Sequence, residues 1–155
     1  MFLSTFEKQL DSKRRIVVPQ EFRAQAAGPF EGVFCLPSIE ADCLEGGGQA
    51  LFSHYRSLIE ELPFGDPLRS ALETAVYGGM TQLSFDAAGR ITLPESFCGE
   101  FGLTDWVVLV GMGDRFQIWP REAYKPRRAD TLKTAREGLA ALRNAQRLAK
   151  AGGAA

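Results

Sequence analysis

Hydrophobic and polar residues alternate in several short stretches of the chain, and each such stretch predicts a β-strand. The alternation is clearest at 81–85, where Thr81, Leu83 and Phe85 share one face. Short apolar or β-branched runs between turn residues predict further strands at 3–10, 15–18, 33–36, 39–44, 90–93, 106–110 and 115–119. Residues 111–114 join the last two strands with a glycine-rich hairpin signal.

Helical spacing replaces this alternation in the middle and at the end of the chain. Apolar residues at 51, 52, 55, 58, 59 and 62 follow the 3.6-residue period and predict a helix that Pro63 ends. Asp66 and Pro67 have the form of an N-cap and a first-turn proline, so a second helix is expected through Val76. From position 130 a narrow, alanine-rich apolar stripe flanked by cations predicts a C-terminal helix that is marginal by itself.

One sequence pattern occurs twice, 75 positions apart. Residues 10–22 and 85–97 both follow Asp-x-x-x-Arg-Ile-x-x-Pro-x-x-Phe, and each proline is expected to begin a helical turn. The offset exceeds the period of about 20–50 residues found in stacked repeats. We therefore interpret the pattern as a duplicated half-domain whose two copies build one pseudo-symmetric unit. The expected fold is α+β and mainly β.

This duplication divides the chain into three expected segments. The first half-domain with its following helices occupies 1–79, the second half-domain occupies 80–124, and a basic C-terminal helix or tail occupies 125–155. A run of three glycines at 46–48 is expected to form a flexible turn in the first segment.

Composition places the chain among ordinary globular proteins, with 155 residues, 45% hydrophobic and 24% charged. No apolar run approaches the roughly 18 residues needed to span a bilayer, and the start lacks a secretory signal, so we expect an intracellular protein without a membrane partner. Cys35, Cys43 and Cys98 are too widely spaced for a disulfide framework or a zinc site. They are expected to be reduced thiols in the core.

The net charge of −1 conceals a strong segregation of charge along the chain. Residues 1–23 carry +2, residues 24–120 carry −9 and residues 121–155 carry +6. Because salt screens charge over about 8–10 Å, a ligand responds to the local face and not to the total. A pI near 5.9 therefore permits nucleic-acid binding, but it argues against a uniformly basic binder.

The two copies differ in the turn between Asp and Arg. The first turn contains Ser12, Lys13 and Arg14, whereas the second contains only Ala87, Ala88 and Gly89. Because the second turn lacks them, the scaffold does not require Lys13 and Arg14, and we predict that the first turn contacts a polyanion. The alternative is a solvated hairpin tip whose charge only aids solubility.

The residues that frame each turn have a structural interpretation as well. Asp11 and Asp86 are expected to accept hydrogen bonds from backbone N–H groups of their own turns, with Gly89 as a turn residue. Arg15 and Arg90 are open to two interpretations, pairing within the fold or contact with a ligand. The candidate residues for contact with a polyanion are Lys8, Lys13, Arg14, Arg15 and Arg90.

The sequence offers little support for an enzyme. His54, the only histidine, lies within the first predicted helix, and no Gly-x-Ser-x-Gly, phosphate-binding loop or Cys-x-x-Cys motif is present. We therefore expect no catalysis, no cofactor, no metal and no small-molecule substrate.

Several motifs then resemble those of one family. They are Met1-Phe2-Leu3, Asp11-Ser12-Lys13-x-Arg15, Pro19, Asp86-x-x-Gly89-Arg90-Ile91-x-Leu93-Pro94, and the apolar block at 107–111 followed by 115–119. Their order and spacing, up to about Tyr124, are similar to those of the MraZ family of bacterial transcriptional regulators.

The resemblance implies a fold and a function. The fold would be a tandem pair of AbrB-like half-barrels, with strands of both copies interleaved in a double-psi or swapped-hairpin barrel. The function would be binding of double-stranded DNA by a homo-oligomeric ring at short G-rich direct repeats. These repeats would lie upstream of the operon for cell division and wall synthesis, so the protein would be cytoplasmic and nucleoid-associated. The Asp-x-x-x-Arg turns would face the DNA.

The chain departs from the family pattern in the first turn. Arg14 stands where the family usually has glycine, and a positive φ there would cost a non-glycine residue roughly 1–2 kcal/mol. The spacer at 45–49 is unusually rich in glycine, and a tryptophan common in the first-half helix is absent. Two other functions remain open: an antitoxin-type protein-interaction module whose basic tail wraps an acidic partner, and a structural ring without sequence-specific DNA binding.

Overall fold

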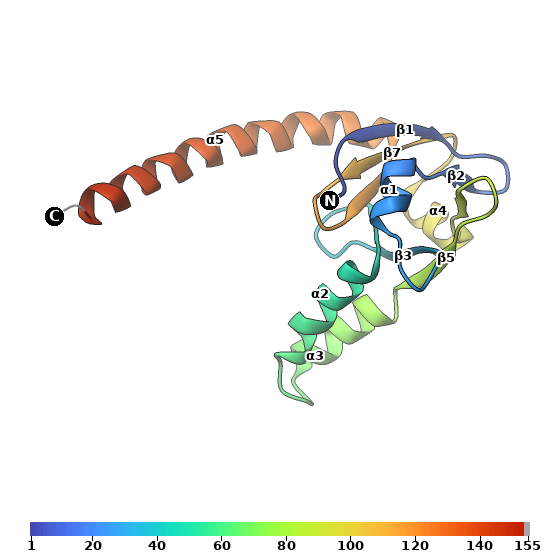
Figure 1. Cartoon of the computed structure of the whole chain (residues 1–155), viewed down its shortest axis with the longest axis horizontal. Coiled ribbons are helices and arrows are strands. Elements are labelled where there is room, and N and C mark those ends of the chain that lie inside the picture. Colours follow the sequence, from blue (N-terminus) through green and yellow to red (C-terminus); the bar gives the residue numbers. More distant parts are fainter. Residues whose placement is uncertain (154–155) are drawn as a thin grey trace. The chain divides into compact units, whose positions relative to one another are not determined.

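The computed structural model describes residues 1–153 and consists of two compact units (Figure 1). Met1–Arg121 form the first unit, and the residues from Glu122 onward form the second. The strands are β1 (Thr5–Gln9), β2 (Arg15–Val17), β3 (Gly32–Pro37), β4 (Leu44–Gly47), β5 (Thr81–Ser84), β6 (Arg90–Thr92), β7 (Trp106–Gly111) and β8 (Phe116–Pro120). The helices are α1 (Gln20–Gln25), α2 (Gln49–Glu60), α3 (Pro67–Leu72), the π-helical turn η1 (Glu73–Tyr77), α4 (Glu95–Phe101) and α5 (Arg121–Gly153).

The strand order shows that the two sequence copies exchange strands. The main antiparallel sheet has the order β1-β7-β8-β4-β3-β5, and β2 pairs with β6 in a second ladder. Strands β1 to β4 belong to the first copy and β5 to β8 to the second. If each strand is replaced by its counterpart in the other copy, the same order appears in reverse. The first strand of each copy therefore pairs with the third strand of the other, as β1 does with β7 and β5 with β3. The expected α+β fold built from two interleaved repeats is confirmed.

The main sheet is open, which differs from the closed barrel that the resemblance implies. Among the described residues, β1 and β5 are edge strands, and β2 and β6 form a ladder only with each other. Each strand of that ladder spans three residues. Pro19 and Pro94 follow closely and lack the N–H that would extend the pairing. The small ladder therefore remains separate from the main sheet.

One hydrophobic core serves both copies. Ile16 and Ile91 lie directly opposite each other in the β2–β6 ladder and are fully buried. They join a cluster that also contains Phe22 of α1 and Phe97 of α4. An aromatic group formed by Phe2, Phe6, Phe22 and Phe116 has ring centroids 5.1–5.3 Å apart. Because both copies contribute to this cluster, it belongs to neither copy alone.

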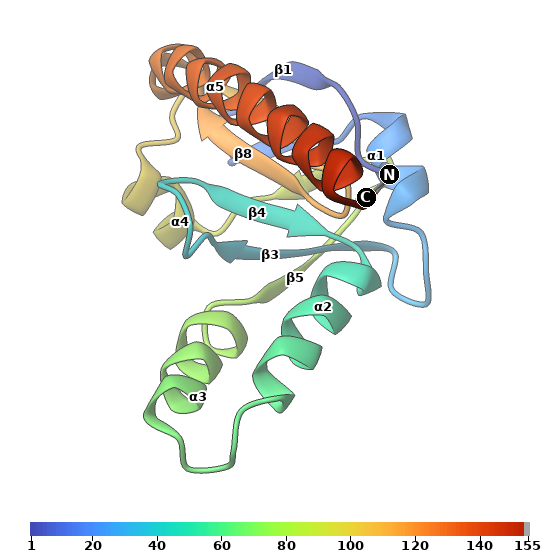
Figure 2. The same ribbon diagram turned by 90° about the vertical axis from the view of Figure 1, so that its left-hand side faces the viewer.

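The two predicted central helices form a hairpin beside β3 and β5, and Figure 2 shows it projecting from the sheet. The backbone N–H of Leu68 donates to the Asp66 side chain at 2.8 Å, which confirms the predicted N-cap. A second, smaller core holds the hairpin to the sheet and contains Leu36, Leu51, Tyr55, Ile59 and Val76. The chain reverses between α2 and α3 at a tip where Phe64 is 92% exposed.

The segment before α2 differs from the prediction of a strand at 39–44 and a flexible turn at 46–48. The Ser38 hydroxyl accepts hydrogen bonds from the N–H groups of Glu40 and Ala41, which holds a turn, and the strand begins only at Leu44. Gly46 and Gly47 lie inside β4 and are buried. A Cβ on Gly46 would overlap the Phe116 ring. The glycines are therefore required for packing within a central strand.

Helix α5, described by itself, begins nine residues earlier than the predicted position 130. It contains no buried residue, and Leu139, Leu142 and Leu148 are 47–67% exposed. Within residues 1–153, no helix combines the length and the apolar character required to cross a bilayer.

Candidate nucleic-acid interface

The first Asp-x-x-x-Arg turn is built around the Asp11 carboxylate. Its Oδ1 accepts hydrogen bonds from the backbone N–H groups of Lys13 at 2.9 Å and Arg15 at 2.8 Å. Its Oδ2 accepts one from Nε of Arg15 at 2.7 Å. The Arg14 N–H donates to the Asp11 carbonyl at 3.0 Å and closes the turn. One carboxylate thus fixes the backbone and the arginine side chain together.

The second turn repeats this arrangement around Asp86. Oδ1 of Asp86 accepts from the N–H groups of Ala88 at 2.9 Å and Arg90 at 2.8 Å, and Oδ2 accepts from Nε of Arg90 at 2.7 Å. The Gly89 N–H donates to the Asp86 carbonyl at 3.0 Å. The motif therefore specifies the same local structure in both copies.

Both carboxylates are held in the ionised form. The hydrogen bond from the backbone N–H of Arg15 lowers the pKa of Asp11, and the Arg15 side chain adds to the effect. The backbone and side chain of Arg90 lower the pKa of Asp86 in the same way. Because the folded-state pKa values are depressed, the turns keep these bonds throughout the neutral range and lose them only as the pH falls below the ordinary carboxyl value of about 4.

The fourth residue of each turn adopts a left-handed backbone conformation. Gly89 has φ +75° and Arg14 has φ +62°. Arginine in this conformation costs about 1–2 kcal/mol relative to glycine. The Arg14 side chain is half-buried, and its Nε donates to the Leu93 carbonyl at 3.1 Å across the copy boundary. That hydrogen bond holds the guanidinium beside the ladder.

Between the two turns lies the outer face of the β2–β6 ladder. Arg15 pairs with Thr92, and Val17 pairs with Arg90, while Ile16 and Ile91 point into the core. Because side chains alternate along a strand, Arg15, Val17, Arg90 and Thr92 share the opposite face. Val17 is 43% exposed. Figure 1 shows both turns on the same side of the first unit.

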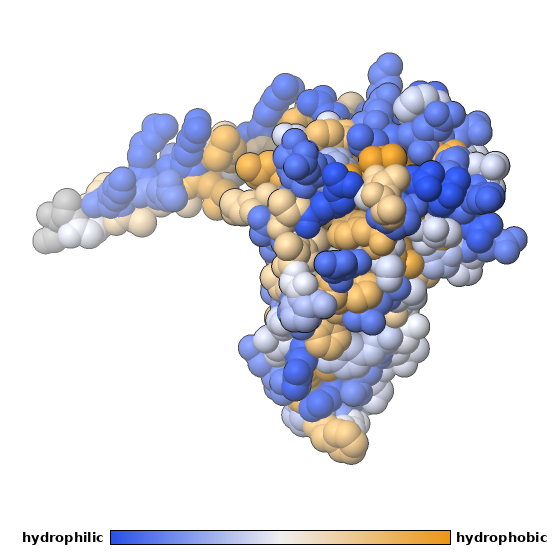
Figure 3. All heavy atoms as spheres, turned by 45° about the vertical axis from the view of Figure 1, so that its right-hand side comes forward, coloured by the Kyte–Doolittle hydropathy of each residue, from blue (hydrophilic) through white to orange (hydrophobic). Residues whose placement is uncertain are grey.

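The structure brings most of the predicted residues to this face. Lys13 is exposed at the tip of the first turn, and Arg14, Arg15 and Arg90 are half-buried around the ladder. Lys8 is separate, because it lies on β1 opposite Val107 and is half-buried on the same side of that strand as Phe6. Figure 3 turns this side of the unit forward and shows hydrophilic residues over much of its upper part.

Sequence reasoning missed Arg23, a half-buried residue of α1. Its guanidinium packs against Gly89, where a Cβ would overlap Nη1. Helix α1 reaches the second turn because the Val18 N–H donates to the Gly89 carbonyl at 3.0 Å. A signal was available in the repeat alignment, since the 75-residue offset pairs Arg14 with Gly89 and Arg23 with Cys98. Each pair combines one arginine with one small residue.

A second cluster of ionisable groups lies inside the fold and is internally paired. Glu45 is 1% exposed, and its carboxylate accepts hydrogen bonds from the Tyr55 hydroxyl at 3.0 and 2.9 Å. Nε of Arg115 lies 2.9 Å from the same carboxylate. Burial and the Glu45 charge raise the pKa of Tyr55, and burial raises the pKa of Cys35 to about 12. These neighbours satisfy Glu45, so the cluster is structural.

Cys35, Cys43 and Cys98 are all buried and free of disulfides, while His54 is exposed on α2. In the part of the chain from 1 to 153, no group of three or more His, Cys, Asp or Glu side chains is placed to hold a metal ion.

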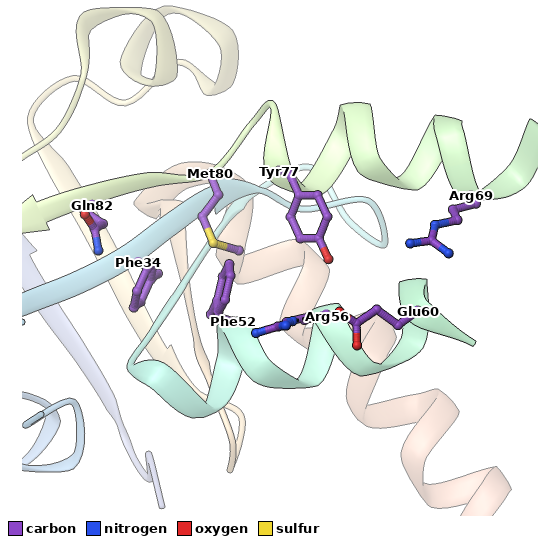
Figure 4. Close-up of a pocket in the computed structure, with 8 residues that line it drawn as sticks. All are labelled: Phe34, Phe52, Arg56, Glu60, Arg69, Tyr77, Met80 and Gln82. Carbon is purple, nitrogen blue, oxygen red and sulfur yellow. Dashed lines mark hydrogen bonds and ion pairs between the residues drawn. The ribbon is translucent and has the colours of Figure 1, made fainter. Parts of the chain in front are cut away.

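A cavity of about 590 Å³ lies between the helical hairpin and the sheet (Figure 4). The Phe34 and Phe52 rings stack in it with centroids 5.5 Å apart, and Nε of Arg56 pairs with Glu60 at 2.8 Å. The lining residues are Phe34, Phe52, Arg56, Glu60, Arg69, Tyr77, Met80 and Gln82. They form a mainly apolar surface without a nucleophile and base in contact, so the two turns remain the stronger candidate site.

Comparison with known proteins agrees with this architecture. A protein-family model described as "MraZ protein, putative antitoxin-like" matches residues 1–74 and again residues 76–137, in accordance with the two copies. A "Transcriptional regulator MraZ" of Phenylobacterium zucineum is 74% identical over 150 residues, covering 97% of this chain and 94% of the relative. The protein of that name from Caulobacter vibrioides is 70% identical over 156 residues and covers both chains completely.

A more distant "Transcriptional regulator MraZ", from Rickettsia bellii, is 38% identical over 146 residues and covers 93% of this chain and 97% of its own. The similarity therefore extends over both copies and is not confined to the turns. The resemblance drawn from the sequence motifs is confirmed, and the chain belongs to the MraZ family.

Proposed function

We propose that the protein is a transcriptional regulator that binds double-stranded DNA through the outer face of the β2–β6 ladder and its two flanking turns. The observation that carries this proposal is the braced first turn, where Asp11 fixes Arg15 and the adjoining Lys13 is exposed. The name of the similar proteins, transcriptional regulator, supports it.

The bracing leaves part of each arginine available to a ligand. Arg15 and Arg90 use Nε to pair with their aspartates, and within residues 1–153 their Nη groups donate no hydrogen bond. An arginine fork matches a phosphate or a guanine edge. Because each fork is already held in place, less side-chain entropy is lost on binding.

One such face would bind weakly on its own. A bidentate arginine–guanine pair discriminates by about 1–3 kcal/mol, and a few phosphate contacts add salt-sensitive affinity. We propose that a homo-oligomeric ring presents the face several times to short direct repeats in the promoter of the cell-division and wall operon. Tethered sites of this kind can raise avidity by roughly 10²–10⁴-fold. The protein would then act in the cytoplasm, on the nucleoid.

The first test replaces the cations of the first turn. Lys13→Ala/Arg15→Ala should abolish the gel shift of a duplex from the protein's own upstream region, because it removes the exposed cation and the braced fork. Light scattering should show an unchanged oligomer. Arg56→Gln serves as a control, since Arg56 lies on α2 with its side chain 60% exposed, outside the proposed face. Retained binding by the double variant would refute the assignment of the turn.

The second test concerns the ring. Duplexes with one repeat and with three repeats should differ in affinity by at least tenfold if several faces engage one DNA molecule. Fluorescence anisotropy at a fixed salt concentration measures both. Equal affinities would discard the role of oligomerisation while leaving DNA binding by a single face intact.

A second candidate function is an antitoxin-type interaction module, which the description of the matching family favours. Residues 121–155 carry +6 and α5 has no buried residue, so this helix could bind an acidic protein. Such a module should co-purify with a second small protein, and truncation after Tyr124 should release that protein. If the tail instead follows DNA, the same truncation should reduce the salt dependence of DNA binding.

A further inference from the structure

We propose that Arg23 of α1 contacts the DNA backbone beside the second turn and supplies there a guanidinium equivalent to that of Arg14 in the first turn. The inference rests on the proposed DNA-binding function and extends it. It adds a phosphate contact to that of Arg90 at the second turn, whose sequence has no cation between Asp86 and Arg90.

The pseudo-symmetry of the ladder places each short helix beside the turn of the other copy. The Val18 N–H donates to the Gly89 carbonyl at 3.0 Å, and the Leu93 N–H donates to the Arg14 carbonyl at 2.8 Å. The 75-residue offset relates the two bonds to each other, because Val18 corresponds to Leu93 and Arg14 corresponds to Gly89. Helix α1 therefore starts at the second turn, and α4 starts at the first turn.

At each of these two junctions, a turn residue lies beside a helix residue, and one of the two is an arginine while the other is small. At the first turn, the turn residue Arg14 carries the guanidinium, and its Nε donates to the carbonyl of Leu93, just before α4. At the second turn, the turn residue is Gly89, and the guanidinium comes from Arg23 of α1. Arg23 and Cys98 occupy equivalent helix positions. Each turn thus has one guanidinium at its fourth position. In the first turn it belongs to the turn residue Arg14, and in the second it comes from Arg23 of α1.

The second guanidinium is available for a ligand. Within residues 1–153, no hydrogen bond or ion pair engages the Arg23 side chain, and the residue is half-buried against the turn. The carboxylate of Asp86, in the same turn, is already paired with Arg90. A positioned guanidinium without a carboxylate partner matches a phosphate, which it can contact with two parallel N–H donors.

This arrangement predicts a binding face with a cationic point at each end of the ladder. Arg15 lies opposite Thr92 and Val17 lies opposite Arg90, so the two turns sit at opposite ends of a ladder of three pairs. Arg14 would contact phosphate at one end, and Arg23 at the other. The contact of Arg23 is with phosphate and not with a base, so its loss should weaken binding to all sequences alike.

The test compares Arg23→Ala and Arg23→Lys with the unmodified chain by anisotropy. The probes are a duplex from the protein's own upstream region and a scrambled duplex of equal length, titrated between about 50 and 200 mM salt. Arg23→Ala should bind both duplexes about threefold to tenfold more weakly, with a slope of log K against log salt smaller by about one. Arg23→Lys should retain the slope, because it keeps the charge.

Controls separate this inference from the proposed function. Melting temperature and light scattering check that Arg23→Ala remains folded and assembled, and Arg56→Ala removes a cation from α2 outside the face. If the unmodified chain binds DNA and Arg23→Ala binds with the same slope and affinity, the role of Arg23 is overturned and the proposed function stands. If the unmodified chain binds neither duplex, the proposed function is overturned, and this inference with it.

Discussion

At the scale of single residues, the fourth position of each turn shows how one backbone conformation accepts two very different side chains. Arg14 and Gly89 both have positive φ. Arginine is disfavoured there, but its Nε–Leu93 carbonyl hydrogen bond offsets part of the cost. Glycine is required at the second turn for a further reason, because the guanidinium of Arg23 occupies the space beside it.

Replacing Gly89 tests this argument. Gly89→Ala should lower the free energy of unfolding by at least about 1–2 kcal/mol, because alanine is strained at φ +75° and its Cβ displaces Arg23. Urea denaturation measures the change. Gly99→Ala is the matched control, since Gly99 lies within α4 with no atom near its Cβ position. That change should stabilise the helix by roughly 0.5–1 kcal/mol, and equal effects at the two glycines would contradict the assignment.

At the scale of secondary-structure elements, the β2–β6 ladder is short and depends on the core beneath it. Each strand has three residues, and a two-stranded ribbon is marginal in water without packing. Ile16 and Ile91 supply that packing at the centre of the ladder, where they face each other. The ladder in turn fixes the positions of both turns.

The ladder's symmetry leads to a prediction about these two isoleucines. Ile16→Ala and Ile91→Ala should each destabilise the protein by about 2–5 kcal/mol and by similar amounts, because both are fully buried at equivalent sites. Val17→Ala, on the exposed face of the same strand, should change stability by less than about 0.5 kcal/mol. Thermal or urea unfolding would reveal the difference, and a loss confined to one isoleucine would exclude a shared central core.

At the scale of the whole molecule, the first unit is one compact structure with interleaved strands although its sequence is a tandem duplication. The central pair is β4 with β8, and β1 and β5 find their partners in the other copy. Removing one copy therefore removes strand partners and core residues at once. The two copies share one core, as the interleaved order requires.

A fragment provides the corresponding prediction. Residues 1–79 alone should not unfold cooperatively as a monomer, because β1, β2 and β4 lose β7, β6 and β8. Circular dichroism during urea titration, combined with sedimentation, would test this. Mixing the fragment with residues 80–124 should restore a cooperative transition. A monomeric 1–79 with a sharp transition of its own would show that the first copy folds without the second.

Most of the local structure follows from the sequence. The helix at 51–62, the Asp66 cap, the two turns and the strands of the second copy lie close to their predicted positions. These features depend on contacts between residues a few positions apart, such as the carboxylate of Asp11 and the backbone at 13–15. The flexible turn at 46–48 was wrong because the local pattern could not show that Gly46 must lie against the Phe116 ring.

The sequence by itself determined that the chain is a duplication with two similar turns, because each turn is closed by hydrogen bonds within five residues. Only the tertiary structure decided how the copies exchange strands and that the sheet stays open. It alone placed Arg23 beside Gly89, 66 positions away. These contacts join segments that are far apart in the sequence. Their stability comes from close packing, in which one side chain fills the space beside another residue. The local sequence pattern does not contain this information.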